Sequence, residues 1–128
     1  MKVLVTGGAG FVGTNLIKRL LKDGHEIVSV DNYSTGKKEN QQDGCVYHDI
    51  DISKTSLLYM DWMKPDIIYH MAARARIQPS IDNPHRTFES NTIGTENILE
   101  YARNENIPVV YAGSSSVHGD IYANPYTF

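Results

Sequence analysis

Three glycines near the start of the chain have the spacing Gly8-x-Gly10-x-x-Gly13, and Gly7 stands directly before them. A short apolar run precedes them and apolar residues at helical spacing follow. In this context glycine permits a tight turn, and it lets the backbone approach a pyrophosphate at a helix N-terminus. A merely flexible turn is the alternative. The pattern predicts a dinucleotide site that includes Gly7, Gly10, Phe11, Val12 and Gly13.

An acidic residue stands at the distance that such a site requires. Asp31 lies 18 residues after Gly13, at the end of the second apolar run. A carboxylate there hydrogen-bonds the ribose hydroxyls of the adenosine, and its charge repels a 2′-phosphate. The position therefore favours NAD over NADP. A strand-end aspartate that makes only a local turn is the alternative.

The elements that would position these groups alternate between strand and helix. Strands are expected at 2–6, 26–30, 45–48, 66–71 and 108–112, and helices at 11–23, 53–63 and 84–106. The expected inner faces are Phe11, Leu16, Ile17, Leu20 and Leu21 for the first helix, and Phe88, Thr95, Ile98, Leu99 and Ala102 for the last. Asn83-Pro84 is a favourable helix start. Residues 32–44 and the segment after the fourth strand are expected to be loops.

Strands that alternate with helices favour a parallel sheet with helices on both faces. Right-handed crossovers give a Rossmann-type, doubly wound α/β fold with strand order 3-2-1-4-5. The 128 residues fit one domain. We therefore expect residues 1–128 to form a single dinucleotide-binding domain.

The composition narrows the possible partners. The net charge is −3 and no basic stripe is present, which argues against nucleic acid. No apolar run reaches the ~20 residues of a membrane span, and the first strand leaves no room for a signal peptide. Cys45 is the only cysteine and is expected to be a strand residue. The five histidines lack metal-ligand spacing, so no metal site is predicted. A cytoplasmic protein is expected.

Several ordered motifs together resemble the extended short-chain dehydrogenase/reductase family, in particular its NAD-dependent nucleotide-sugar epimerases and dehydratases. The resemblance covers the whole chain. Besides the glycine turn it rests on Asp31-Asn32-Tyr33-Ser34-Thr35-Gly36-Lys37, Asp49-Ile50, His70-Met71-Ala72-Ala73, Asn91-Thr92-Ile93-Gly94-Thr95, and Tyr111 to Gly119 with its three serines.

This resemblance implies roles for individual residues. Asn32, Ser34, Thr35 and Gly36 would enclose the adenosine ribose. Asp49 and Ile50 would lie beside the adenine, Met71, Ala72 and Ala73 under the cofactor, and Asn91 would support the active site. Arg74, Arg76, Gln78 and Ser80 stand in a region that borders the substrate in the resembling epimerases, although a solvated loop explains them equally well.

The resemblance also implies two catalytic residues. Ser114 matches the family's catalytic Ser/Thr, with Ser115 and Ser116 as neighbours that are not excluded. Tyr126 matches the tyrosine of the Tyr-x-x-x-Lys motif. A hydroxyl bonded to the loop backbone and a turn tyrosine are the respective alternatives.

The family's chains are much longer than this one. The motif's lysine would fall at position 130, and a substrate domain would follow. An unperturbed tyrosine has a pKa near 10, so without the lysine Tyr126 is expected to be a poor base.

The resemblance implies C4 epimerisation of a nucleotide sugar, expected to be a UDP-sugar, through a transient 4-keto sugar, with this chain as the cofactor-binding half. A nucleotide-sugar 4,6-dehydratase and an NAD(H)-binding module without turnover remain alternatives. The fifth strand would be an exposed sheet edge, which favours a homo-oligomer or a complementing chain.

Overall fold

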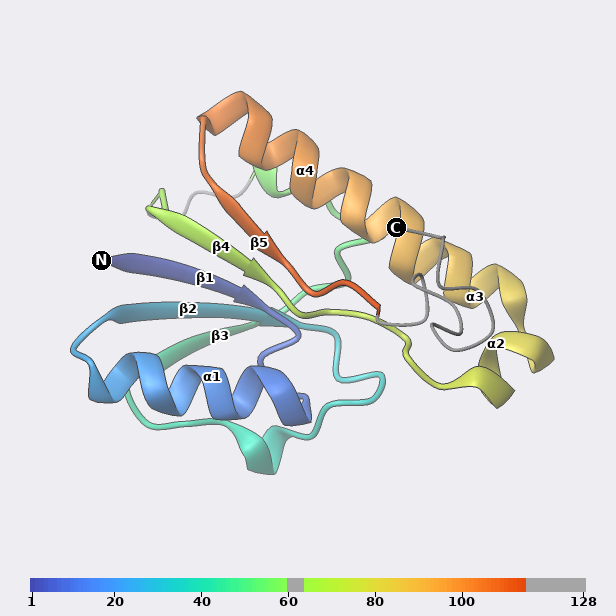
Figure 1. The fold of residues 1–128 in the computed structure, drawn as a ribbon, viewed down its shortest axis with the longest axis horizontal. Helices are drawn as coiled ribbons and strands as arrows, with labels where there is room; N and C mark the ends of the chain where they lie inside the picture. Colours follow the sequence, from blue (N-terminus) through green and yellow to red (C-terminus); the bar gives the residue numbers. More distant parts are fainter. Residues whose placement is uncertain (60–63, 115–128) are drawn as a thin grey trace, which may run out of the picture.

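A computed structural model describes residues 1–59 and 64–114, and Figure 1 shows the arrangement of its elements. Five parallel strands form one sheet in the order β3-β2-β1-β4-β5, as the sequence predicted. The strands are β1 (Lys2–Thr6), β2 (Glu26–Asp31), β3 (Cys45–Asp49), β4 (Ile67–His70) and β5 (Val109–Tyr111). The helices are α1 (Phe11–Lys22), α2 (Ile77–Asp82), α3 (Pro84–Phe88) and α4 (Gly94–Glu105).

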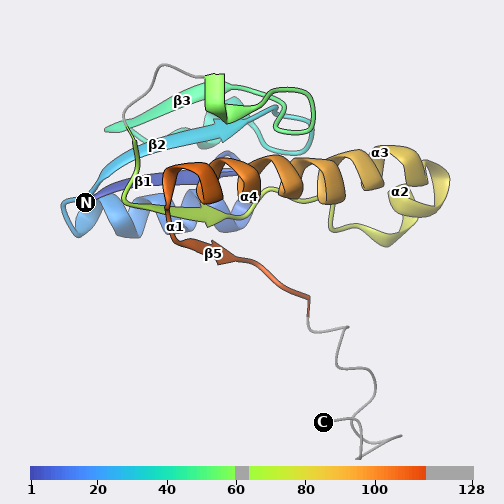
Figure 2. The ribbon, with the colours of Figure 1, turned by 90° about the horizontal axis from the view of Figure 1, so that it is seen from above.

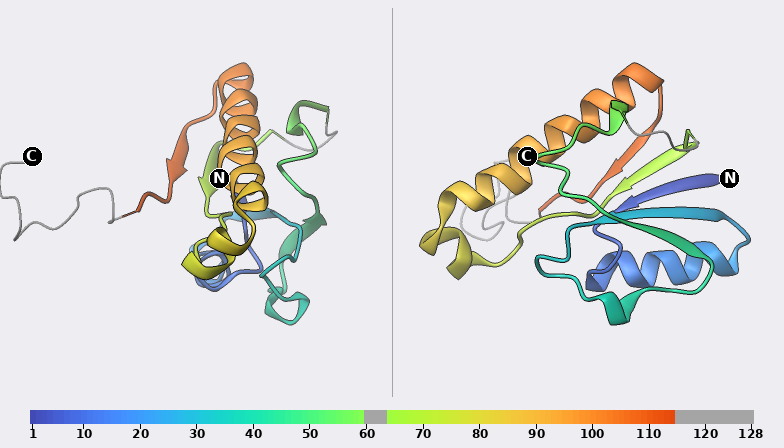
Figure 3. Two further views of the ribbon diagram at one scale, coloured as in Figure 1. Left: turned by 90° about the vertical axis from the view of Figure 1, so that its right-hand side faces the viewer. Right: turned by 180° about the vertical axis from the view of Figure 1, so that it is seen from behind.

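Helices cover both faces of the sheet because β1 alternates its side chains between them. Val3 and Val5 pack with Ile17 and Leu20 of α1, whereas Leu4 packs with Ile98 of α4. In Figure 1 and in the right panel of Figure 3, α1 and α4 accordingly lie on opposite sides of the fanned strands. Figure 2 shows α4 running along its face toward α2 and α3.

The segment expected to form one helix at 84–106 is helical, but it is not one regular α-helix. A π-helical turn, Glu89–Ile93, separates α3 from α4. α3 has no buried residue, whereas α4 buries Gly94, Ile98, Tyr101 and Ala102, so the expected inner face is not shared by the two helices. Phe88 and Leu99 are 52% and 49% exposed, whereas Tyr101, which the prediction left out, is 4% exposed and belongs to the core.

Two further expectations about helices were wrong. In place of a helix at 53–63, the described part has a turn followed by a 3₁₀ turn, Leu57–Tyr59, and residues 60–63 lie outside the described residues. The Asp51 carboxylate accepts hydrogen bonds from both the amide and the hydroxyl of Ser53, which favours a turn over a helix here. The segment after β4, expected to be a loop, contains α2.

Smaller differences concern helix ends. Phe11 is not on the inner face of α1, since it is the first helical residue and is 85% exposed. The stop near Gly24 is confirmed by its positive φ of 80°. Asn83 caps α3 as predicted, because its side chain accepts a hydrogen bond from the amide of Arg86. Residues 32–44 are irregular apart from one 3₁₀ turn, Lys38–Asn40.

Candidate dinucleotide site

A pocket lies at the carboxyl ends of β1, β2, β3 and β4, where ligands bind in open parallel sheets. Thirteen of the sixteen cofactor residues predicted from the sequence line it. They are Gly7, Gly10, Phe11, Val12, Gly13, Asp31, Asn32, Ser34, Thr35, Ile50, Met71, Ala72 and Ala73. The fold therefore brings together four segments that are far apart in the chain.

The glycine turn is shaped by contacts that leave no room for side chains. Gly7 has a φ of 71°, and a Cβ there would lie 2.8 Å from the Cα of Ala72 on the loop after β4. A Cβ on Gly13 would collide with the carbonyl oxygen of Gly7. Glycine at these two positions lets α1 start directly above the end of β1.

The amino end of α1 lies at the same pocket. Gly10 is the N-cap and provides no side-chain cap, and the first turn has no acidic residue. Phe11, Val12 and Gly13 line the pocket there. Uncapped amides at a helix N-terminus, reinforced by the helix dipole, bind phosphate groups.

Asp31, at the end of β2, lines the pocket as well. It is 9% exposed, and its two carboxylate oxygens accept hydrogen bonds from the amides of Ala9 (2.9 Å) and Tyr33 (2.8 Å). The bond to Tyr33 is the local turn considered as an alternative, and the bond to Ala9 ties β2 to the glycine turn. Each carboxylate oxygen has a further lone pair, so Asp31 can still accept from a ligand hydroxyl.

Three predicted cofactor residues do not line the pocket. Gly36 packs against Ala9, where a Cβ would lie 2.9 Å from the Ala9 carbonyl carbon. Asp49 is exposed, with a carboxylate oxygen 3.8 Å from Nζ of Lys38. Asn91 instead clasps the backbone of Arg74, accepting from its amide at 2.8 Å and donating to its carbonyl at 3.0 Å. Their roles toward a cofactor stay predictions.

Five lining residues were not among the predicted cofactor residues: Val30, Asp51, Ile52, Arg74 and Ser90. Asp51 replaces Asp49 as the carboxylate at the β3 end of the pocket. Burial acts to raise the pKa of Asp51, but hydrogen bonds from Ser53 and Asn32 together with the charge of Lys54 lower it overall. The sequence held one indication that Asp51 lies in the pocket, because it directly follows Ile50, which was predicted to lie beside the adenine.

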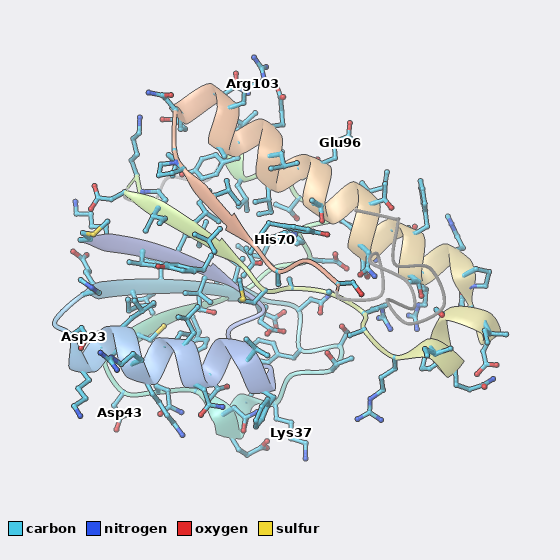
Figure 4. The ribbon with its side chains drawn as sticks, viewed as in Figure 1. Asp23, Lys37, Asp43, His70, Glu96 and Arg103 are labelled. Atoms are coloured by element: carbon cyan, nitrogen blue, oxygen red, sulfur yellow. The ribbon has the colours of Figure 1, made fainter. Side chains whose placement is uncertain are left out.

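His70, which is labelled in Figure 4, takes part in a series of hydrogen bonds that begins at the amide of Ala72, a residue that lines the pocket. The Thr95 hydroxyl donates to the carbonyl of Asn91, so it must accept from His70 Nε2 at 2.9 Å. In the resulting neutral ring, Nδ1 accepts from the Thr6 hydroxyl at 2.7 Å, and Thr6 accepts from the Ala72 amide. Burial lowers the pKa of His70 to about 4, which keeps the ring neutral.

The predicted catalytic residues are only partly described. Ser114 is exposed and follows β5, which pairs with β4 on the side away from β1. Ser115, Ser116 and Tyr126 lie outside the described residues. Cys45 is half-buried, and burial raises its thiol pKa to about 11, which agrees with a structural strand residue and not a nucleophile.

Two further searches covered the described residues. No group of three or more histidine, cysteine or acidic side chains is arranged to hold a metal ion in residues 1–59 and 64–114. Within the same ranges no helix is long and apolar enough to cross a membrane.

The site fits a dinucleotide on structural grounds alone. A glycine cradle that a Cβ would fill and an uncapped helix end suit a pyrophosphate, and a buried carboxylate at the end of β2 suits a ribose. Fold and site together define a Rossmann-type dinucleotide-binding domain.

Comparison with known proteins identifies the family within this class. The model of the NAD-dependent epimerase/dehydratase family matches residues 3–127, so the chain belongs to that family. The expected family, fold class and cofactor are thereby confirmed, since NAD is the cofactor that the family's description names.

Individual relatives agree with this assignment. The chain is 36% identical over 124 residues to UDP-glucuronic acid decarboxylase 1 of Danio rerio and 34% identical over 131 residues to UDP-glucose 4-epimerase of Mycolicibacterium smegmatis. These matches cover 97% and 98% of this chain but 30% and 41% of the relatives. The crystal structure of Thermus thermophilus UDP-glucose 4-epimerase with NAD aligns with a TM-score of 0.82 at 35% identity, covering 89% of this chain and 38% of that one. The chain therefore spans about a third of its relatives' length.

Proposed function

We propose that residues 1–128 are the NAD-binding part of an enzyme that epimerises a nucleotide sugar of the UDP-sugar class at C4. The observation that carries the proposal is the pocket at the carboxyl ends of β1 to β4, where the glycine turn, Asp31 and the Met71-Ala72-Ala73 segment meet. The similarity to a UDP-glucose 4-epimerase over nearly the whole chain supports it. Bound NAD would supply the hydride acceptor and donor that such a reaction needs.

The chain's own residues would divide the remaining tasks. The first-turn amides of α1 would bind the pyrophosphate, and Asp31 would accept from the adenosine ribose. Ser114 would hydrogen-bond the reacting sugar hydroxyl, and Tyr126 would move its proton. The position of Ser114 just beyond β5, next to the β4 end of the pocket, supports this division.

Two other outcomes remain within the same family. The similarity to a UDP-glucuronic acid decarboxylase favours decarboxylation of a UDP-sugar acid as the second candidate. A nucleotide-sugar 4,6-dehydratase shares the cofactor requirement. If residues 1–128 acted by themselves, they would bind NAD(H) without turnover.

The experiment uses the protein as encoded, with any residues that follow Phe128. NAD binding is measured by calorimetric titration, and products are resolved by chromatography after incubation with UDP-glucose, UDP-galactose, UDP-glucuronic acid or dTDP-glucose in separate reactions. Interconversion of UDP-glucose and UDP-galactose is the expected result.

Each of the other possible results would assign a different activity to the protein. Release of CO₂ from UDP-glucuronic acid would replace epimerisation by decarboxylation, and loss of water from dTDP-glucose would indicate a dehydratase. Binding of NAD with no product from any substrate would favour a binding module. No heat with millimolar NAD would contradict the site itself.

A further inference from the structure

The charged side chains of the pocket are separated by sign. Among the described residues that line it, Asp31 and Asp51 are the acidic residues and Arg74 is the only basic one. Asp31 is the last residue of β2 and Asp51 follows β3, whereas Arg74 follows β4, on the other side of β1. The acidic side chains therefore lie at one end of the pocket, where Lys54 pairs with Asp51 at 3.9 Å, and the basic side chain lies at the other.

This polarity has a direction along the cofactor. The proposed function places the adenosine ribose at Asp31 and the pyrophosphate at the start of α1. Since α1 follows β1, the central strand of the sheet, the remaining half of a dinucleotide extends toward β4. Arg74 consequently lies on the nicotinamide side, together with Met71, Ala72 and Ala73.

Arg74 is held in place from two directions. Asn91, in the π-helical turn, bonds both the amide and the carbonyl of the Arg74 backbone. Nε of the side chain donates to Oγ of Ser90 at 3.1 Å. The side chain is half-buried, and its guanidinium forms no ion pair with a carboxylate of residues 1–59 or 64–114. Its positive charge is thus fixed and is not neutralised by those residues.

The two redox forms of the cofactor differ in charge where Arg74 lies. Oxidation of a sugar hydroxyl to a ketone breaks the carbon–hydrogen bond and moves a hydride to the nicotinamide, while the hydroxyl proton leaves to a base. The nicotinamide ring thereby changes from a cation to a neutral dihydropyridine. A fixed positive charge nearby repels the first form and not the second.

We propose that Arg74 makes the site prefer NADH over NAD⁺, so that bound cofactor is a stronger oxidant than free NAD⁺. This inference rests on the proposed function and adds to it a residue that favours the oxidation half of the reaction. In this role the positive charge of Arg74 acts on the nicotinamide ring, and the side chain takes up no proton.

The test compares the dissociation constants of NAD⁺ and NADH, measured by calorimetry and by nicotinamide fluorescence in the protein as encoded. Arg74→Gln is expected to lower the ratio Kd(NAD⁺)/Kd(NADH) about three- to tenfold, the range for a unit charge in a partly solvated site. Arg74→Lys, which keeps the charge, is expected to retain most of the ratio. Arg76→Gln is the matched control, because Arg76 is exposed and does not line the pocket.

A ratio that stays unchanged in Arg74→Gln would overturn the inference while leaving the proposed function intact. Failure of the unmodified protein to bind either form would contradict the proposed function as well. If Arg74→Gln does not fold, the unmodified protein decides the matter. Added salt screens a charge in a partly solvated site, so the ratio must fall from low to high ionic strength, and a constant ratio would overturn the inference.

Discussion

His70 and Thr95 are joined by a hydrogen bond of 2.9 Å between Nε2 and Oγ1, which belongs to a series of hydrogen bonds running from the Ala72 amide to the Asn91 carbonyl. Thr95 donates onward to the Asn91 carbonyl, so Nε2 of His70 must donate, and the pKa of about 4 that burial gives His70 keeps the ring neutral. Asn91 in turn holds the backbone of Arg74. The ring that stabilises the contact between β4 and α4 therefore also supports the pocket.

Acid is expected to destabilise the protein through His70. Its pKa is about 4 in the folded protein and near 6.5 in the unfolded chain, so the unfolded state binds the proton first. The stabilisation is complete above about pH 6.5, is lost as the pH falls toward 4, and totals roughly 3 kcal/mol. Urea unfolding at several pH values measures it.

Variants separate this effect from general acid unfolding. His70→Gln keeps a donor and an acceptor but does not titrate, and it should remove that part of the pH dependence. His85→Gln, at a side chain 80% exposed, should leave the dependence unchanged. An identical pH profile for His70→Gln and the unmodified protein would refute the assignment.

Gly13→Ala is expected to reduce NAD affinity at least about tenfold and to destabilise the fold by about 1–3 kcal/mol, because the added methyl meets the Gly7 carbonyl. Calorimetry and urea unfolding give the two values. Gly24→Ala is the control: its positive φ makes alanine costly, but it lies at the far end of α1, so stability should fall and affinity should not. Unaltered NAD binding by Gly13→Ala would contradict the proposed approach of the turn to the pyrophosphate.

Asp31→Asn is expected to weaken NAD binding at least about tenfold and to cost about 1–3 kcal/mol, because an amide group cannot accept at both positions where the Ala9 and Tyr33 amides donate. The same two measurements apply. Asp49→Asn is the matched control, since that carboxylate is exposed and only distantly paired with Lys38. Equal losses in both variants would mean that the Asp31 contacts do not shape the site.

Ser29→Ala is expected to raise the free energy of unfolding by about 1 kcal/mol. The Ser29 side chain is 0% exposed, and its hydroxyl has no hydrogen-bond partner among the described residues. Removing a buried, unpaired hydroxyl relieves its desolvation cost. Ser53→Ala, which deletes a hydroxyl bonded to Asp51 at 2.6 Å, should instead lower stability in the same urea titration. A stability loss in Ser29→Ala would show that the hydroxyl has a partner.

Much of the site could be predicted because many of its residues belong to short sequence motifs. The glycine turn needs only local backbone freedom, and Asp31 is placed by the end of one strand. The π-helical turn could not be predicted, because the apolar spacing of residues 84–106 is compatible with a continuous helix. The π-helical turn contains Asn91, which hydrogen-bonds the backbone of Arg74, and it is followed by Thr95, which hydrogen-bonds His70. These bonds join different elements, so local spacing does not reveal them.

The sequence alone determined the dinucleotide turn, through the backbone freedom of its glycines, and the parallel sheet, through the alternation of strands with helices. The strand order then follows from the right-handed crossovers that such units make. The tertiary structure alone decided that Asp51 and not Asp49 lines the pocket, that His70 is buried between Thr6 and Thr95, and that Arg74 is held at the β4 end of the pocket. Each of these depends on burial and hydrogen bonding between segments from different parts of the chain, which residue types and spacing do not encode.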